Sequence, residues 1–252
     1  MRGVGLALCA SLASLPALAQ QPGKGFDTYE VLKLSCDGIV QAVNTGIAEG
    51  HLNASLLAAE LFDGGTCVGK DPARAAGVLD DAARKGSTVA AQRLALKFAL
   101  GDGVPQSYAM AGAWFLGKAQ GTAPLTTQDY SRGYASAIVA LAMRNAQFPR
   151  SAAEVGAGAD LAVALNPLKP LEAEIKVTSR RSRALATGSM VSRDYGKVYE
   201  RMLRGKIEEA VAKLPPPKTE LLVDAVVKRD LSFHFTDRGT MEMVEDRILN
   251  AP

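Results

Sequence analysis

The residues of this chain that could carry out chemistry are few and far apart. Only two histidines occur, His51 and His234, and His51 follows Gly50 at a predicted helix end, where a surface or capping role is favoured over that of a base. The chain contains neither the Gly-x-Ser-x-Gly elbow nor the Ser-x-x-Lys motif of acylating enzymes. A pair of catalytic carboxylates stays open as an alternative, since such a pair has no sequence signature. The sequence therefore predicts a protein that is not an enzyme.

No cofactor site is predicted either. Gly156 and Gly158 stand in Gly-Ala-Gly-Ala-Asp-Leu, which lacks the third glycine of a dinucleotide-binding loop and follows no predicted strand. The cysteines and the two distant histidines make no cluster of metal ligands. We therefore expect no nucleotide, no metal ion and no other cofactor.

Residues 1–19 have the features of a secretory signal peptide. A basic residue precedes an apolar run that ends in Ala17-Leu18-Ala19, the small-x-small pattern of a cleavage site before Gln20. No later segment approaches the ~20 apolar residues that a membrane crossing needs. We expect a soluble periplasmic or secreted protein. The alternative, a lipid anchor on Cys9, is disfavoured because Leu8 stands where a small residue is wanted.

Cys36 and Cys67 are the cysteines left after removal of the signal peptide. Thiols pair in an oxidising compartment, so the sequence predicts a disulfide between them. Cys36 lies in an apolar-periodic stretch, a capping helix within residues 20–51, and the bond would tie this helix to the segment that follows. Closing a loop of about 30 residues is worth roughly 3–4 kcal/mol. The alternative is a pair of buried free thiols.

Residues 52–122 repeat themselves with a period of 36 residues. Each unit has two amphipathic segments separated by a turn with glycine, and the second segment of the second unit starts after Ser107, which can cap a helix. A period of this length indicates a solenoid, in which each helical hairpin buries its apolar face against its neighbours. The first unit has Ala54, Ala59, Phe62, Gly65, Val68, Ala75, Leu79 and Ala83, where the second has Ala90, Ala95, Phe98, Gly101, Val104, Ala111, Phe115 and Ala119.

This pattern resembles the Sel-one-like repeat (SLR) family, a relative of the tetratricopeptide repeats. Two residues depart from it, since Cys67 replaces the second turn glycine and Lys118 replaces the first alanine of a small pair. The resemblance implies an α-α superhelix, a packing role for Trp114 in the family's tryptophan position, and an adaptor or regulator of the bacterial envelope. The family's structural positions are filled by Phe62, Gly65, Val68, Phe98, Gly101, Gly103, Val104, Trp114 and Phe115.

The next two segments are expected to continue the helical part of a mainly α chain. Residues 123–168 predict a degenerate third hairpin, whose second helix would start after Phe148-Pro149. Residues 169–214 predict a basic helical region, with one long helix in the second half.

Residues 215–252 are expected to form a Pro linker and a short β tail. Pro215-Pro216-Pro217 predicts a stiff linker, because consecutive prolines hold an extended backbone. From Leu221 onward the apolar period becomes two, and Asp237-Arg238-Gly239 provides a turn. The turn alone resembles that of periplasmic energy-transducer carboxyl domains. We expect a β-hairpin or a three-stranded α+β tail that packs on the preceding helix.

The basic helix around Arg201 and Arg204 is one candidate partner surface. Its charged face is either simply solvated or binds an anionic surface, such as an acidic protein, a cell-wall polymer or lipid headgroups. Nucleic acid is not expected, because aromatic residues do not interleave with the basic ones.

The family resemblance provides a second candidate surface, since the first helices of successive hairpins line the concave side of such arrays. Arg93 and Lys97 stand one helical turn apart there and would present two positive charges together. We expect another envelope protein as the partner, with peptidoglycan or another polysaccharide as the alternative and a hydrolase as the less favoured one. The positions of the second unit not used for packing are Gln92, Arg93, Leu96 and Lys97.

Overall fold

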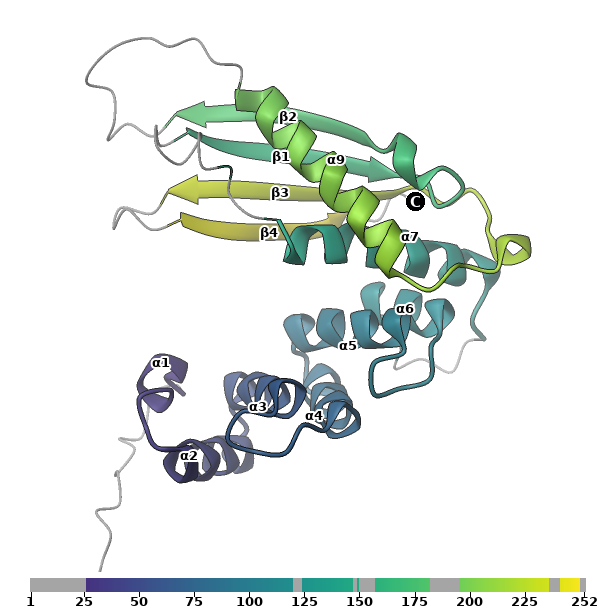
Figure 1. The fold of residues 1–252 in the computed structure, drawn as a ribbon. Helices are drawn as coiled ribbons and strands as arrows, with labels where there is room; N and C mark the ends of the chain where they lie inside the picture. The colour runs from purple at the N-terminus through teal and green to yellow at the C-terminus, as the bar shows by residue number, and fades with distance from the viewer. Residues whose placement is uncertain are drawn as a thin grey trace, which may run out of the picture.

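The computed structural model describes residues 26–119, 124–146, 149, 157–181, 195–235 and 241–249. The predicted signal peptide, Cys9 and the predicted turn Asp237-Arg238-Gly239 lie outside these residues. The described chain is mainly helical, with a small antiparallel sheet (Figure 1). Its α-helices are α1 (Thr28–Val31), α2 (Cys36–Ala48), α3 (Leu52–Gly64), α4 (Pro72–Arg84), α5 (Thr88–Leu100), α6 (Tyr108–Phe115), α7 (Thr127–Arg144) and α9 (Tyr195–Lys213).

Three of these helices begin at intervals of 36 residues. They are α2, α4 and α6, which start at Cys36, Pro72 and Tyr108. The side chain of the preceding cap accepts a hydrogen bond from the backbone N–H three residues later, and these caps are Ser35, Asp71 and Ser107. Such bonds satisfy N–H groups that have no partner inside the helix. The predicted capping helix, α2, therefore stands where the second helix of a preceding hairpin would stand.

The turns inside the two predicted repeats share one backbone geometry. α3 and α5 end at Gly65 and Gly101, whose φ angles are 71° and 73°. The backbone N–H of Asp71 donates to the carbonyl of Phe62 at 2.8 Å, and the equivalent bond 36 residues later has the same length. Glycine is favoured at such positive φ because it has no Cβ. The period of the sequence is thus also a period of the structure in α3–α4 and α5–α6.

A pair of glycines allows α6 and α7 to cross closely. A Cβ on Gly112 would lie 2.0 Å from the carbonyl oxygen of Asp129, and a Cβ on Gly133 would lie 1.9 Å from that of Tyr108. α7 itself begins with a capping box, in which Thr126 and Asp129 bond to each other's backbone N–H groups. This crossing connects the hairpins to the helix on which the sheet rests.

The second half of the predicted third hairpin is a strand and not a helix. α7 accounts for the first half of residues 123–168, but β1 runs over Ala157–Leu165. Burial of every second residue is the period of a strand with one face in the core. α9, which comes later in the chain, packs against α7 in place of the expected helix. The buried residues of β1 include Ala159, Leu161, Val163 and Leu165.

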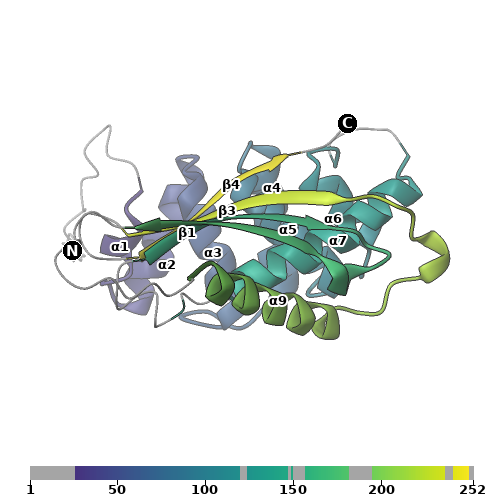
Figure 2. The ribbon, with the colours of Figure 1, turned by 90° about the horizontal axis from the view of Figure 1, so that it is seen from above.

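The sheet has four antiparallel strands in the order β2-β1-β3-β4. α9 packs on β2 and β1, and α7 contacts β3, so both helices lie on one face of the sheet. Viewed from above, α9 runs along one side of the sheet (Figure 2). The other strands are β2 (Glu174–Arg181), β3 (Val227–Phe235) and β4 (Met241–Leu249), and two short 3-10 turns are η1 (Pro170–Glu172) and η3 (Thr219–Leu221).

Two other segments differ from their predicted boundaries. Residues 169–214, predicted to be helical, contain β2 as well as α9. The β tail predicted within residues 215–252 begins at Val227 and not at Leu221. It is also no separate tail, because β3 pairs with β1 in the middle of the sheet. The helical period predicted for α9 agrees with its buried residues Tyr199, Leu203, Ile207 and Ala210.

Candidate interaction face

The four residues predicted to bind a partner all lie on α5, but two of them are inside the protein. Leu96 and Lys97 are only 7% and 5% exposed. The prediction is therefore wrong for both. Lys97 stands 36 residues after Leu61, which is buried as well, so it lies on the packed side of the helix. Gln92 and Arg93 are half-buried and reach the surface.

Ion pairs make a buried lysine possible at this position. The ammonium group of Lys97 lies 2.6 Å from Asp63 Oδ1 and 2.8 Å from Asp102 Oδ2. Arg93 lies 2.6 Å from Glu60 Oε1, so two charge pairs tie α5 to α3. A buried ammonium group needs such partners, because removing it from water costs several kcal/mol. The two positive charges predicted to face a partner are instead used between the first helices of the two hairpins.

One side of the first helices can be defined by distance from their caps. α3, α5 and α7 follow His51, Ser87 and Thr126. Five residues beyond each cap stand Leu56, Gln92 and Ser131, of which the first two are half-buried and the third is buried. Asn53, Glu60 and Val89 share this side by helical periodicity and are exposed. These six residues are named the first-helix face: Asn53, Leu56, Glu60, Val89, Gln92 and Ser131.

The chain itself covers the first-helix face on α7. Ser131 Oγ donates to the carbonyl of Leu221 at 3.3 Å and accepts from the backbone N–H of Val223 at 2.8 Å. Residues 215–223, which include the predicted proline linker, therefore lie against α7 and are named the strap. Sequence reasoning missed Ser131. Ser131 stands five residues after its helix cap, as Gln92 does, and this pattern could have identified the two positions as equivalent.

Two tyrosines, Tyr108 and Tyr130, bind the amino-terminal half of the strap, and a third packs against Tyr108. The rings of Tyr130 and Tyr134 lie edge-on to Tyr108, with centroids 5.5 and 5.0 Å away. The Tyr108 hydroxyl donates to the carbonyl of Pro215, and the Tyr130 hydroxyl accepts from the backbone N–H of Lys218 at 2.7 Å. Burial, with the neighbouring tyrosines, raises the pKa of Tyr108, so its hydroxyl stays protonated and able to donate. The predicted stiff linker is thus a docked segment.

The predicted structural positions of the repeats differ in burial, and the three turn glycines among them, Gly65, Gly101 and Gly103, are exposed. Trp114 and Phe115 are buried, in agreement with the packing role expected for Trp114. The indole Nε1 of Trp114 has no hydrogen-bond partner among the described residues. Phe62 and Phe98 are half-buried, and the Arg74 guanidinium lies 4.5 Å from the ring centroid of Phe62.

The basic helix α9 has several of its charges paired within the protein. Arg204 lies 2.9 Å from Glu200 and donates to the carbonyl of Ala173 at 3.0 Å. Lys206 lies 2.7 Å from Glu209. Arg201 is exposed. These pairs reduce the positive surface that the sequence predicts for an anionic partner.

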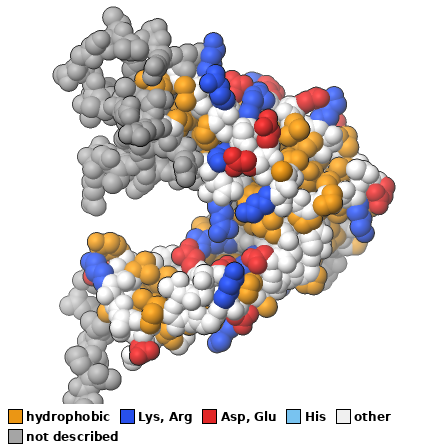
Figure 3. Space-filling view, in the orientation of Figure 1, with side chains coloured by type: hydrophobic (Ala, Val, Ile, Leu, Met, Phe, Trp, Pro, Cys, Tyr) orange, Lys and Arg blue, Asp and Glu red, His pale blue; other side chains and the backbone are white. Residues whose placement is uncertain are grey.

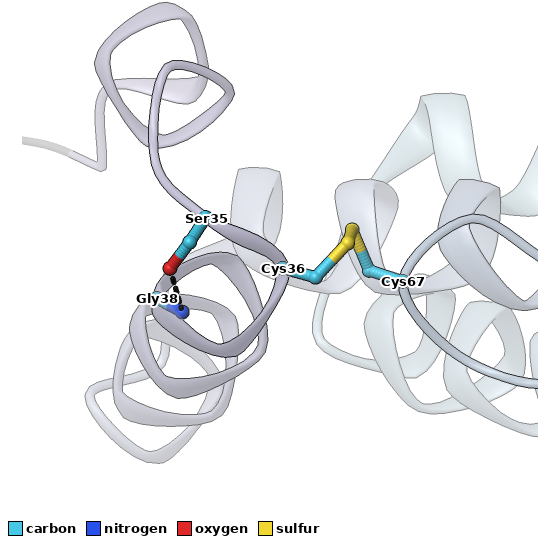
Figure 4. Close-up of a disulfide and its surroundings, with 4 residues drawn as sticks. All are labelled: Ser35, Cys36, Gly38 and Cys67. Carbon is cyan, nitrogen blue, oxygen red and sulfur yellow. Dashed lines mark hydrogen bonds between the residues drawn. A yellow bond between two sulfur atoms is a disulfide. The ribbon is translucent and has the colours of Figure 1, made fainter.

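The predicted disulfide between Cys36 and Cys67 is present, with the two Cα atoms 4.9 Å apart (Figure 4). Cys67 has a φ of 62° and is the one non-glycine residue at positive φ in the described chain. It stands 36 residues before Gly103, whose φ is 74° and whose Cβ, if present, would lie 2.3 Å from the backbone of Pro72. Pro72 in turn stands 36 residues after Cys36. The disulfide therefore occupies the joint that a close backbone contact fills in the next unit.

Two kinds of site were searched for across the described ranges. No group of three or more His, Cys, Asp and Glu residues in them could hold a metal ion. None of the helices in this part of the chain combines the length and the apolar character of a membrane span.

Comparison with known proteins does not place the chain in a family. No family model matches it, and no curated protein matches it either. The resemblance to the SLR family therefore depends on the repeat residues themselves.

Proposed function

We propose that this protein is an exported scaffold of Sel-one-like repeats, arranged as an α-α superhelix, that binds a segment of another protein along the first-helix face. The observation that supports the proposal is the strap. Ser131 already holds a stretch of chain through two backbone groups. Leu56 and Gln92 occupy the same position on α3 and α5 and remain accessible.

The accessible positions have suitable chemistry for a polypeptide ligand. The amide of Gln92 can donate to a carbonyl and accept from an N–H, as the hydroxyl of Ser131 does. Leu56 and Val89 offer apolar contacts beside it. The Arg93–Glu60 pair adds opposite charges that can orient a partner. Figure 3 also shows a hollow between the α1–α3 end and the layer that contains the sheet, with charged side chains gathered at its inner end.

Site-specific crosslinking tests this proposal. A photo-reactive amino acid at position 92, in the full-length protein made in its own host, should give a covalent adduct with a specific protein on irradiation. The matched control carries the same group at Asp81, an exposed position on α4 outside the first-helix face. Adducts from position 81 but not from position 92 would contradict the proposed face. An adduct that contains carbohydrate would favour the polysaccharide alternative.

Export is tested separately by sequencing the amino terminus of the protein recovered from the cell envelope or the medium. We expect it to begin at Gln20, because Ala17-Leu18-Ala19 has the form of a cleavage site. The disulfide supports this expectation, since disulfides persist in oxidising compartments. A mature protein that still begins at Met1 would contradict it.

A further inference from the structure

We propose that the Cys36–Cys67 disulfide is a reducible joint, whose exchange with a dithiol releases α1 and α2 from the rest of the chain without unfolding the later hairpins. The same contact between a repeat turn and the start of a helix occurs twice in the chain, and the disulfide makes the first of these contacts covalent. In the second joint, Gly103 packs directly on the backbone of Pro72. In the first, both positions are cysteines, so the contact depends on a bond that can be broken.

The helices held by this joint share a small hydrophobic cluster with one side of α3. Ile39 and Val43 are the large buried side chains that α2 contributes, and α1 adds Val31. They do not belong to the large cluster that runs from the other side of α3 through the sheet. A unit with so few large buried side chains depends strongly on a crosslink. The complete set of buried residues in this smaller cluster is Phe26, Val31, Ile39, Val43, Ala54, Leu57, Ala58 and Leu61.

The backbone conformation of Cys67 also makes the contact with α2 less stable once the disulfide is broken. A residue with a Cβ is less stable than glycine at a φ of 62°, because Cβ approaches the neighbouring carbonyl. Gly103 meets no such penalty in the second joint. After reduction, Cys67 is free to leave this conformation, and the contact with α2 is lost with it.

The disulfide is accessible to a reductant. Cys36 is exposed and Cys67 is half-buried. A thiolate of the dithiol attacks one sulfur and displaces the other cysteine as a thiolate, which leaves a mixed disulfide. The second thiol of the reagent then displaces the first cysteine. The dithiol is oxidised to a disulfide by two electrons, and Cys36 and Cys67 are both reduced to thiols.

Release would uncover one side of α3. Four buried residues of this helix belong to the same hydrophobic cluster as the buried residues of α1 and α2: Ala54, Leu57, Ala58 and Leu61. All are apolar, so reduction would convert a closed end of the helical array into an exposed hydrophobic surface.

Hydrogen exchange of the full-length protein, with and without dithiothreitol, tests the proposal. In the reduced protein, peptides from residues 26–50 should exchange about 100-fold faster or more, the effect expected from losing a crosslink that closes a loop of about 30 residues. Peptides from α5 and α6 should keep their rates. Unchanged exchange in residues 26–50 overturns the proposal. Equal acceleration throughout the chain also overturns it, because the unit would then not open separately.

The matched control transplants the second joint into the first. The double variant Cys36→Pro with Cys67→Gly has proline at position 36, as at Pro72, and glycine at position 67, as at Gly103. Proline is well suited to the first position of a helix, and glycine to a positive φ. Its residues 26–50 should stay protected to the same extent with and without dithiothreitol. A variant that still opens in the presence of the dithiol would show that the reagent acts elsewhere, and the proposal would be wrong.

Discussion

Lys97 stands where the preceding hairpin has Leu61, and its charge is compensated by Asp63 and Asp102. We expect Lys97→Glu to lower the free energy of unfolding by ~3–5 kcal/mol, because it removes the compensating charge and adds a third carboxylate to a buried position. Lys97→Leu should cost much less. The side chains of Asp63 and Asp102 are 38% and 50% exposed, so water can solvate them once the lysine is gone. Urea unfolding of both variants measures the difference, and equal losses would contradict this account.

Asp129 connects the start of α7 to Lys118, with 2.9 Å between the ammonium group and the carboxylate. Burial by itself raises the pKa of Asp129, but the hydrogen bonds from Lys118 and Thr126 outweigh it and hold that pKa below its usual value. A carboxyl group with a lowered pKa in the folded state stabilises the protein above its unfolded pKa of about 3.9. This stabilisation is lost as pH falls through the lower, folded pKa.

The lowered pKa of Asp129 predicts how the stability of Asp129→Asn, relative to wild type, depends on pH. The difference in unfolding free energy between wild type and Asp129→Asn should be largest at neutral pH and shrink as pH falls below about 4. Urea denaturation at a series of pH values measures it. A difference that is constant from neutral to acidic pH would mean that the ionised form of Asp129 has no special partner in the fold.

The candidate site was predicted only in part, for a reason visible at Lys97. Its partner Asp63 is 34 residues away in the sequence. A lysine with no visible partner is expected at the surface, because burial of an unpaired charge is very costly. Gln92 and Arg93 are half-buried and reach the surface, where the sequence alone also predicts them. Buried charges depend on contacts that local sequence patterns do not reveal.

The α6–α7 crossing offers a test at the scale of the helices. Gly133→Ala would put a Cβ 1.9 Å from the carbonyl oxygen of Tyr108, so the two helices would have to move apart. We expect a loss of about 3 kcal/mol or more in unfolding free energy, at or above the usual range for overpacking. Gly205→Ala is the matched control, because a Cβ there meets no atom within 4 Å and the residue lies inside α9.

The control should raise stability by about 0.5–1 kcal/mol, the usual gain from alanine in a helix interior. Thermal unfolding of the two variants beside wild type makes the comparison. If Gly133→Ala were as stable as Gly205→Ala, the close approach of α6 and α7 would not be a feature of the protein in solution.

Elements with local patterns were predicted, and those that depend on distant pairing were not. α3 to α6 follow from helical periods, caps and turn glycines that lie within one repeat. β1 has the sequence Ala-Gly-Ala-Asp-Leu-Ala-Val-Ala-Leu, in which alanine favours a helix. In the sheet, β1 lies between β2 and β3. β3 is far along the chain, and its Leu231 stands opposite Leu161 of β1. Strand preference depends on such neighbours, so the sequence alone favoured the wrong structure.

At the scale of the whole molecule, α9 and the strap join the helical hairpins to the sheet. β1 and β3 pair with each other, but α9 and residues 215–223 lie between them in the chain. Because α9 packs on α7 and the strap is bonded to α6 and α7, the sheet is held against the last helices of the array. The sheet should therefore unfold together with the last helices of the array, α6 and α7.

Ser131 tests this coupling, because its hydroxyl is the link to the carboxyl-terminal end of the strap. Ser131→Ala removes the bonds to Leu221 and Val223 and leaves the N–H of Val223 without its partner. We expect a loss of ~1–3 kcal/mol in unfolding free energy, the usual cost of such a group. Hydrogen exchange should accelerate in the strap and in β3, while α4 and α5 keep their rates.

Ser136→Ala is the matched control, since Ser136 is equally buried on α7 but makes no described bond to the strap. If both variants change exchange in the strap equally, its attachment does not depend on Ser131, and the comparison between Ser131 and Gln92 loses its basis.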